Sequence, residues 1–111
     1  MPEVLSQTDL QKILSRLKEH LQEIYGDRFS KMILFGSQAR GEATTDSDID
    51  VLIVLKGEVD FGAEVERTAE FVSNLCLDFD QVIGSFFMAE QDFISRNSPL
   101  LINVRREGIA I

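Results

Sequence analysis

The run DIDVLIVL, Asp48 to Leu55, constrains the fold more than any other part of this 111-residue chain. Successive side chains of an extended strand point to opposite sides, so the run is apolar on both faces beyond Asp50. A strand of this kind belongs in the middle of a sheet that is covered on both sides. We therefore expect a layered fold in which helices pack on both faces of a sheet.

Four other segments carry apolar residues at helical spacing. In the first, Ser6 or Thr8 can cap the start and Gly26 can end the helix. In the second, Phe61 and Val65 begin the stripe that we expect to face the core. The expected helices cover residues 6–26, 60–78, 89–97 and 98–108.

Short apolar runs bounded by turn residues predict strands over residues 31–35, 48–55 and 79–88, with a fourth over 109–111. Gly36 closes the first strand, and Gly84 suggests a bulge in the third. The order of elements predicts an α/β (α+β) fold, a small mixed sheet flanked by helices. The length suits a single domain over residues 1–111.

The composition narrows the classes of partner. Lysine and arginine total 11 against 19 acidic residues, a net charge of -8, which disfavours direct binding of a long nucleic acid. Cys76 is the only cysteine, so an internal disulfide and a Cys-rich zinc site are excluded. The longest apolar run, Val51 to Leu55, is too short to span a membrane. We expect a cytoplasmic protein without a membrane partner.

Two acids in DIDVLIVL point to chemistry. Asp48 and Asp50 are two residues apart on the predicted strand, so both carboxylates project from one face with Cα atoms about 7 Å apart. Such a pair repels unless a cation lies between the two carboxylates, and Mg²⁺ with substrate phosphates suits these oxygen ligands. Upstream, Gly36 lets the backbone approach a phosphate and Ser37 adds an N–H and a hydroxyl. Arg40 is a further candidate for phosphate contact.

The stretch ILFGSQARGEATTDSDIDVLIVL resembles the signature of the minimal nucleotidyltransferases of the DNA polymerase beta superfamily. The resemblance implies a palm-like mixed sheet, Mg²⁺, and transfer of a nucleoside monophosphate from a nucleoside triphosphate. The expected group and donor are AMP and ATP. By position in the motif, Gly36 and Ser37 take phosphate-binding roles. Asp48 and Asp50 take catalytic, metal-binding roles.

This family usually has a third carboxylate on a later strand, which binds metal and helps to activate the acceptor hydroxyl. Asp78 and Asp80 are the candidates, because both share a face of the predicted third strand. Asp80 is preferred as the third catalytic and metal-binding residue because it lies further into that strand. Val82 departs from the usual pattern of an acid followed by apolar residues.

The resemblance also implies a partner. Minimal nucleotidyltransferases are commonly encoded beside a HEPN protein, a helical toxin-type RNase, so this chain is expected to act as the antitoxin by adding AMP to that partner. Two alternatives stay open: a module that neutralises a partner by contact alone, and a nucleotidyltransferase of small molecules such as aminoglycosides. The sequence leaves room for a homo-oligomer.

Overall fold

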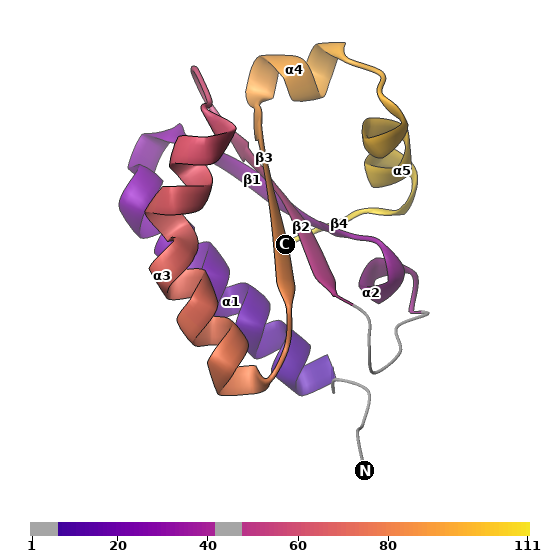
Figure 1. The fold of residues 1–111 in the computed structure, drawn as a ribbon. Coiled ribbons are helices and arrows are strands. Elements are labelled where there is room, and N and C mark those ends of the chain that lie inside the picture. The colour runs from indigo at the N-terminus through magenta and orange to yellow at the C-terminus, as the bar shows by residue number, and fades with distance from the viewer. Residues whose placement is uncertain (1–6, 42–47) are drawn as a thin grey trace.

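The computed structural model describes residues 7–41 and 48–111 (Figure 1). Helices and strands alternate along the chain, as the hydrophobic periodicity predicts. In chain order the elements are α1 (Gln7–Tyr25), a 3-10 turn η1 (Gly26–Arg28), β1 (Phe29–Phe35), α2 (Ser37–Arg40), β2 (Ile49–Leu55), α3 (Phe61–Phe79), β3 (Ile83–Ala89), α4 (Glu90–Ser95), α5 (Pro99–Glu107) and β4 (Ile109–Ala110).

The sheet is mixed and its strand order is β3-β2-β1-β4. The central strand β2 pairs antiparallel with β1 and parallel with β3. Every residue of β2 is buried except Asp50, which is half-buried. The prediction of a central strand covered on both sides is therefore confirmed, as is the short terminal strand, which pairs antiparallel with β1.

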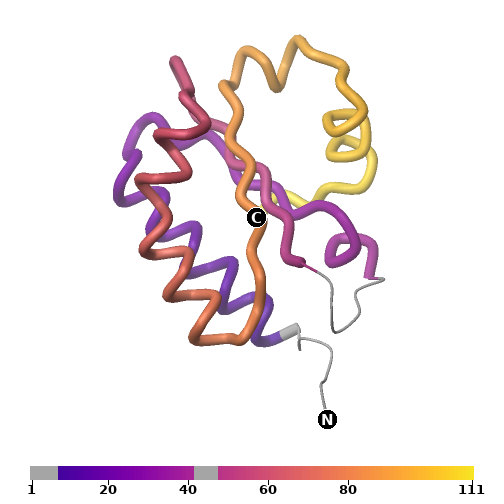
Figure 2. Tube along the Cα trace, in the orientation of Figure 1, coloured from indigo at the N-terminus to yellow at the C-terminus, as the bar shows by residue number. Residues whose placement is uncertain are grey.

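Helices cover both faces of the sheet (Figures 1 and 2). Helices α1 and α3 lie side by side on one face, where their apolar residues and those of β2 such as Val51 and Ile53 form the larger core. On the other face, Leu52 and Val54 pack with Leu101 and Val104 of α5. The predicted α/β (α+β) sandwich is confirmed. No helix among the described residues is long and apolar enough to cross a membrane.

The ends of the helices follow the expected signals. Helix α1 stops before Gly26, whose φ of +54° suits a residue without a Cβ. The Ser98 hydroxyl accepts a hydrogen bond from the Leu101 N–H at 3.2 Å, and Pro99 occupies the first turn of α5. At the start of α1 the outcome is partial: Ser6 lies outside the described residues, and Thr8 lies inside the helix.

The predicted start of the third strand, at Phe79, is wrong. Helix α3 continues to Phe79 because Leu75, Cys76 and Phe79 keep the helical spacing that packs them against the core. Asp80 then caps the helix in a left-handed conformation (φ 52°), and its N–H bonds the Cys76 carbonyl. The strand begins only at Ile83, so Asp78 and Asp80 do not share a strand face.

The predicted inner face of α3 is also partly wrong. Phe61 and Val65 are 52% and 37% exposed, whereas Glu64, which lies outside the predicted stripe, is buried. Glu64 is tolerated there because its carboxylate accepts a hydrogen bond from the Tyr25 hydroxyl at 2.9 Å and pairs with Arg67 at 3.1 Å. A polar contact with α1 thus sets the rotation of α3 about its axis.

Two single residues complete the comparison with the sequence. His20, expected in solvent, is partly buried, and its ring stacks on that of Phe71 with centroids 3.9 Å apart. No local pattern predicts this contact, since the two residues lie on different helices. Cys76 is a free thiol that packs against the larger core, as predicted.

Candidate active site

Asp50 lies near the start of β2, between the end of β1 and the start of β3. In the sheet register Asp50 is opposite Phe35 on one side and Gly84 on the other. Gly36, the residue after Phe35, is therefore its close neighbour as well. The antiparallel and parallel pairings of β2 together bring residues 36, 50 and 84 to one corner of the sheet.

Two glycines make room for the Asp50 carboxylate. A Cβ built on Gly36 would lie 2.8 Å from Asp50 Oδ2, and one built on Gly84 would lie 2.9 Å from Asp50 Oδ1. Gly36 also has a φ of +79°, which disfavours any other residue. The ladder from β2 to β3 runs through Gly84 without a break, so the expected bulge is wrong. A glycine within a strand can instead mark a close approach of another group. Here that group is the Asp50 carboxylate, which the sequence pattern around Gly84 does not predict.

The carboxylates of Asp50 and Asp48 lie close enough to interact. Burial raises the pKa of the Asp50 carboxyl above its ordinary value, and the negative charge of Asp48 raises that pKa further. No neighbouring cation lowers this pKa. Asp48 directly precedes β2 and is exposed. The pair is thus a half-buried carboxylate beside an exposed one, and the charge of the exposed carboxylate disfavours ionisation of the half-buried one.

The turn after β1 follows the predicted pattern of a glycine and a serine that open a short helix. Gly36 is the N-terminal cap of α2, and its carbonyl accepts hydrogen bonds from the N–H groups of Ala39 and Arg40 at 3.1 and 3.2 Å. Ser37 is the first residue of α2. Gly36 and Asp50, far apart in the sequence, are in contact distance at this turn.

Arg40 pairs with a partner that the sequence did not suggest. Its guanidinium lies 3.1 Å from the Glu107 carboxylate at the end of α5, and both side chains are partly exposed. This ion pair links α2 to α5. The phosphate contact predicted for Arg40 stays a prediction.

Among the described residues, the structure brings no third carboxylate to the pair. Asp80 caps α3, and Asp78 in the last turn of α3 lies 3.9 Å from Arg16. Among residues 7–41 and 48–111 there is no group of three or more acidic, histidine or cysteine side chains that could hold a metal ion. The β3 position beside Asp50, where such an acid would stand, is Gly84, and the next position on that face is Phe86. The strand-face argument for Asp80 is therefore wrong.

The residues present fit a nucleotide-bound magnesium ion better than a cage made by the protein alone. Asp48 and Asp50 offer hard oxygen ligands, and the repulsion between their carboxylates favours a cation between them. Mg²⁺ is usually held by one or two carboxylates while phosphates and water complete its shell. Two acids and a nearby turn that approaches phosphate satisfy this requirement.

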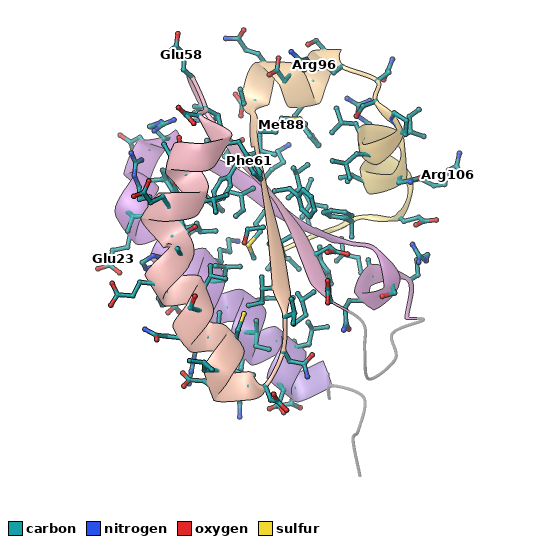
Figure 3. All side chains as sticks on the ribbon, viewed as in Figure 1. Glu23, Glu58, Phe61, Met88, Arg96 and Arg106 are labelled. Atoms are coloured by element: carbon teal, nitrogen blue, oxygen red, sulfur yellow. The ribbon has the colours of Figure 1, made fainter. Side chains whose placement is uncertain are left out.

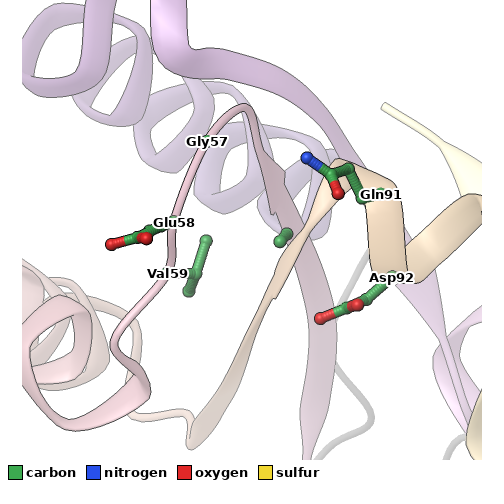
Figure 4. Close-up of a pocket in the computed structure, with 6 residues that line it drawn as sticks. Gly57, Glu58, Val59, Gln91 and Asp92 are labelled. Atoms are coloured by element: carbon green, nitrogen blue, oxygen red, sulfur yellow. The ribbon is translucent and has the colours of Figure 1, made fainter.

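A hollow lies at the end of β2 and β3 that is opposite to the Asp48–Asp50 pair (Figure 4). It measures about 420 Å³ and is lined by Gly57, Glu58 and Val59 after β2 and by Ala89, Gln91 and Asp92 at the end of β3. Asp92 pairs with Arg96 at 3.4 Å. None of the predicted site residues lines this hollow, so it is separate from the Asp48–Asp50 pair.

Comparison with known proteins agrees with this geometry. The model of the nucleotidyltransferase domain family matches residues 14–101. A candidate protein adenylyltransferase of Methanocaldococcus jannaschii is 36% identical over 99 residues, which cover 88% of this chain and 93% of that protein.

Solved structures share the fold. A nucleotidyltransferase from Sulfolobus solfataricus aligns with a TM-score of 0.64 at 17% identity, covering 96% of this chain and 87% of the other. A toxin–antitoxin structure with AMP-PNP aligns with a TM-score of 0.59 at 19% identity, covering 96% of this chain and 72% of the other. The strand that carries Asp50, the glycine turn beside it and the match over most of the chain lead to one conclusion: this protein is a nucleotidyltransferase and belongs to the nucleotidyltransferase domain family.

Proposed function

We propose that this protein transfers AMP from ATP to a hydroxyl group of a partner toxin and thereby acts as its antitoxin. The observation that carries the proposal is the Asp50 carboxylate, held between Gly36 and Gly84 and beside Asp48. Two similarities support the choice of acceptor. One relative is named a protein adenylyltransferase, and one solved neighbour is a toxin–antitoxin structure with a nucleotide analogue.

In this proposal Asp48 and Asp50 hold Mg²⁺ together with the phosphates of the nucleotide. The ion supplies neutralisation of the charge that develops on the phosphate oxygens. Burial, and then the charge of Asp48, raise the pKa of the Asp50 carboxyl, and a cation between the two carboxylates would relieve the repulsion between them.

The chain's own residues position the reactants. The backbone at Gly36 and the N–H and hydroxyl of Ser37 hold the triphosphate, since the missing Cβ at Gly36 allows close approach. An acceptor oxygen attacks the α-phosphorus and pyrophosphate leaves. Catalysis then rests on positioning and charge neutralisation. Since no described residue adds a third carboxylate to the pair, the acceptor's proton is taken up by water or by a group of the partner in this proposal.

The nature of the partner is part of the proposal. The resemblance of the Gly36–Asp50 motif to minimal nucleotidyltransferases points to a HEPN-type toxin, a basic RNA-binding protein that an acidic chain would attract. A cytoplasmic location, where such a partner would act, stays a prediction.

Neutralisation by contact alone is the second candidate, and one observation favours it. Gly84 occupies the strand position where a third carboxylate would face Asp50. A site with two acids could retain nucleotide binding while turnover is slow. The two candidates differ in one measurable product, AMP attached to the partner.

The experiment combines the protein with Mg²⁺, ATP and the toxin encoded beside it, followed by mass spectrometry of the toxin. AMP on the toxin that disappears with Asp48→Asn/Asp50→Asn supports the enzyme. A toxin that is neutralised without label, and equally well by the double variant, overturns transfer in favour of contact. The matched control is Asp9→Asn/Asp27→Asn, which removes two charges far from the motif in the sequence.

A further inference from the structure

The negative charge of this protein is concentrated in one segment. Residues 58–92, which contain α3 and β3, hold nine of the 19 acidic residues and one of the 11 basic residues, Arg67. The segment therefore carries -8, the net charge of the whole chain, while the other residues are balanced at ten acidic and ten basic. Its surroundings attract basic molecules and repel acidic ones.

The same segment contains the open edge of the sheet. Among the described residues β3 is the terminal strand, next to β2 only, and in Figure 1 it crosses in front of the other strands. Its seven residues, IGSFFMA, include no charged residue and no proline. Charged residues and prolines commonly protect an edge strand from pairing with another chain. Because β3 has neither, this edge is unprotected.

The direction of the free backbone groups follows from one hydrogen bond. The Ile49 N–H bonds the Val82 carbonyl at 2.9 Å, so the backbone groups of residue 82 face β2. Because these groups alternate along a strand, the N–H and C=O groups of Ile83, Ser85 and Phe87 face away from β2. These three residues offer donors and acceptors to an incoming strand.

An apolar groove runs beside this edge. A hollow of about 230 Å³ lies between α3, which contributes Val65 and Val72, and β3, which contributes Ile83 and Ser85. The Ser85 hydroxyl is buried and has no hydrogen-bond partner among residues 7–41 and 48–111. An added strand could place alternate side chains in this groove.

Large apolar side chains are exposed along both faces of this edge. Phe61, which projects from the start of α3 and is labelled in Figure 3, is 52% exposed, and its ring lies 6.4 Å from that of Phe87. Val82 and Phe86 are 60% and 36% exposed. Exposed apolar side chains beside an unpaired strand are typical of a protein–protein interface.

We propose that the β3 edge and the adjoining groove bind an extended segment of a partner protein, apolar at alternate positions and basic at its ends. The segment adds a strand to the sheet through main-chain hydrogen bonds and places apolar side chains against Val65 and Ile83. The charge of residues 58–92 disfavours a second copy of this chain and repels nucleic acid. The inference goes beyond the proposed nucleotidyl transfer and does not depend on it.

The test uses two synthetic peptides with the same apolar centre, each labelled with fluorescein: Lys-Arg-Val-Thr-Val-Thr-Val-Arg-Lys and Glu-Asp-Val-Thr-Val-Thr-Val-Asp-Glu. Fluorescence anisotropy measures binding to the full chain, and hydrogen exchange measures the protection of individual amides. The basic peptide should bind and slow the exchange of Ile83, Ser85 and Phe87. Equal binding of the acidic peptide, or unchanged exchange at saturation with the basic one, overturns the proposal.

Matched variants separate main-chain pairing from general charge attraction. Ser85→Pro removes an outward N–H and should weaken binding of the basic peptide about tenfold or more, whereas Ser85→Ala keeps the N–H and should bind like the natural chain. Glu66 is exposed on α3 beside Val65, and Glu23 is exposed on α1. Glu66→Lys should weaken binding of the basic peptide more than Glu23→Lys does. Figure 3 labels Glu23 for comparison. If Ser85→Pro does not fold, the test rests on Glu66→Lys and Glu23→Lys. Equal weakening of peptide binding by these two variants overturns the proposal.

Two further results bear on this proposal, and the first concerns another occupant of the edge. Concentration-dependent dimerisation that Ser85→Pro abolishes would assign the edge to a second copy and overturn the proposal. The Asp48→Asn/Asp50→Asn variant should bind the basic peptide as the natural chain does, so failure of nucleotidyl transfer and failure of this inference remain distinguishable.

Discussion

The corner around Asp50 and the α3–β3 segment use acidic residues in opposite ways. At the corner, one carboxylate is held tightly between Gly36 and Gly84 and has its pKa raised. Across residues 58–92 the acids are numerous and mostly exposed, and they accompany exposed apolar side chains. A tightly confined charge suits binding of an ion at a fixed position, whereas a broad negative surface suits attraction of a partner. The predictions below test this division.

Among substitutions that keep both carboxylates, the largest expected effect is that of Gly84→Ala on nucleotidyl transfer. The new Cβ would lie 2.9 Å from Asp50 Oδ1 and displace the carboxylate, which can move more easily than the strand. We expect transfer to fall about 100-fold, as for a misplaced catalytic group, with little loss of stability. Steady-state kinetics and thermal denaturation check this.

Gly62→Ala in α3 is the matched control for this glycine substitution. Its Cβ would meet Asp60 Oδ1 at 3.6 Å, an ordinary contact. Transfer should be unchanged, and stability should rise by about 0.5–1 kcal/mol because alanine favours the helix. If both variants lose activity equally, the confinement of Asp50 has no special role.

Tyr25→Phe tests what fixes the rotation of α3. The substitution removes the hydrogen bond to buried Glu64, so unfolding at neutral pH should become easier by about 1.5 kcal/mol, the lower end for hydrogen bonds to charged groups. Urea denaturation measures this change. A loss below the error of the measurement would mean that apolar packing, rather than the Tyr25–Glu64 contact, orients α3.

The same pair predicts a dependence on pH. Burial and the hydrogen bond to Glu64 raise the pKa of Tyr25 to about 12. The folded state therefore keeps the phenol proton more tightly than the unfolded chain, in which the pKa is about 10. The resulting stability is complete below pH of about 10 and is lost as pH rises towards 12. The difference in unfolding free energy between the natural chain and Tyr25→Phe should shrink over that range, and a constant difference would contradict it.

Asp50→Asn should increase stability slightly while it abolishes magnesium-dependent binding. Burial and the charge of Asp48 both disfavour the charged carboxyl, and a neutral amide of the same shape avoids both effects. We expect the free energy of unfolding to rise by about 0.5 kcal/mol at neutral pH, because residues of functional sites commonly reduce stability. Asp48→Asn, at the exposed member of the pair, is the comparison. Lower stability of Asp50→Asn would show that the carboxylate is structural.

The smallest expected effects concern Arg40 and Glu107. Removal of either member of this partly exposed ion pair should cost about 0.5 kcal/mol, and the double variant should cost little more than either single one. Urea denaturation of the three variants checks this. A tenfold rise in KM for ATP in Arg40→Ala alone, without loss of stability, would instead assign Arg40 to the nucleotide.

Local patterns predicted most of the fold. The two-faced apolar run fixed β2 as the central strand, and Ser98-Pro99 marked the start of α5. The Gly36–Asp50 neighbourhood also followed from the motif, because a turn and the next strand are short-range features. Position along the chain was a good guide wherever the relevant residues are close in sequence.

The errors involve contacts between distant segments. The pairing of Asp50 with Gly84 depends on the parallel register of β2 and β3, which no local pattern specifies. The burial of Glu64 depends on Tyr25, 39 residues away. The extent of α3 was underestimated because Phe79 suits a strand by propensity, yet it packs against the core from the last turn of the helix. Because of that error, Asp80 was predicted on a strand face, whereas it caps α3.

The most direct measurement is calorimetric titration with AMP-PNP, with and without Mg²⁺, of the natural chain and of Asp50→Asn. If the confined acid at the corner of the sheet holds a metal-bound nucleotide, the natural chain will bind the analogue only with Mg²⁺, and Asp50→Asn will not bind it under either condition. Equal affinity with and without the ion, or unchanged affinity in Asp50→Asn, would contradict the account.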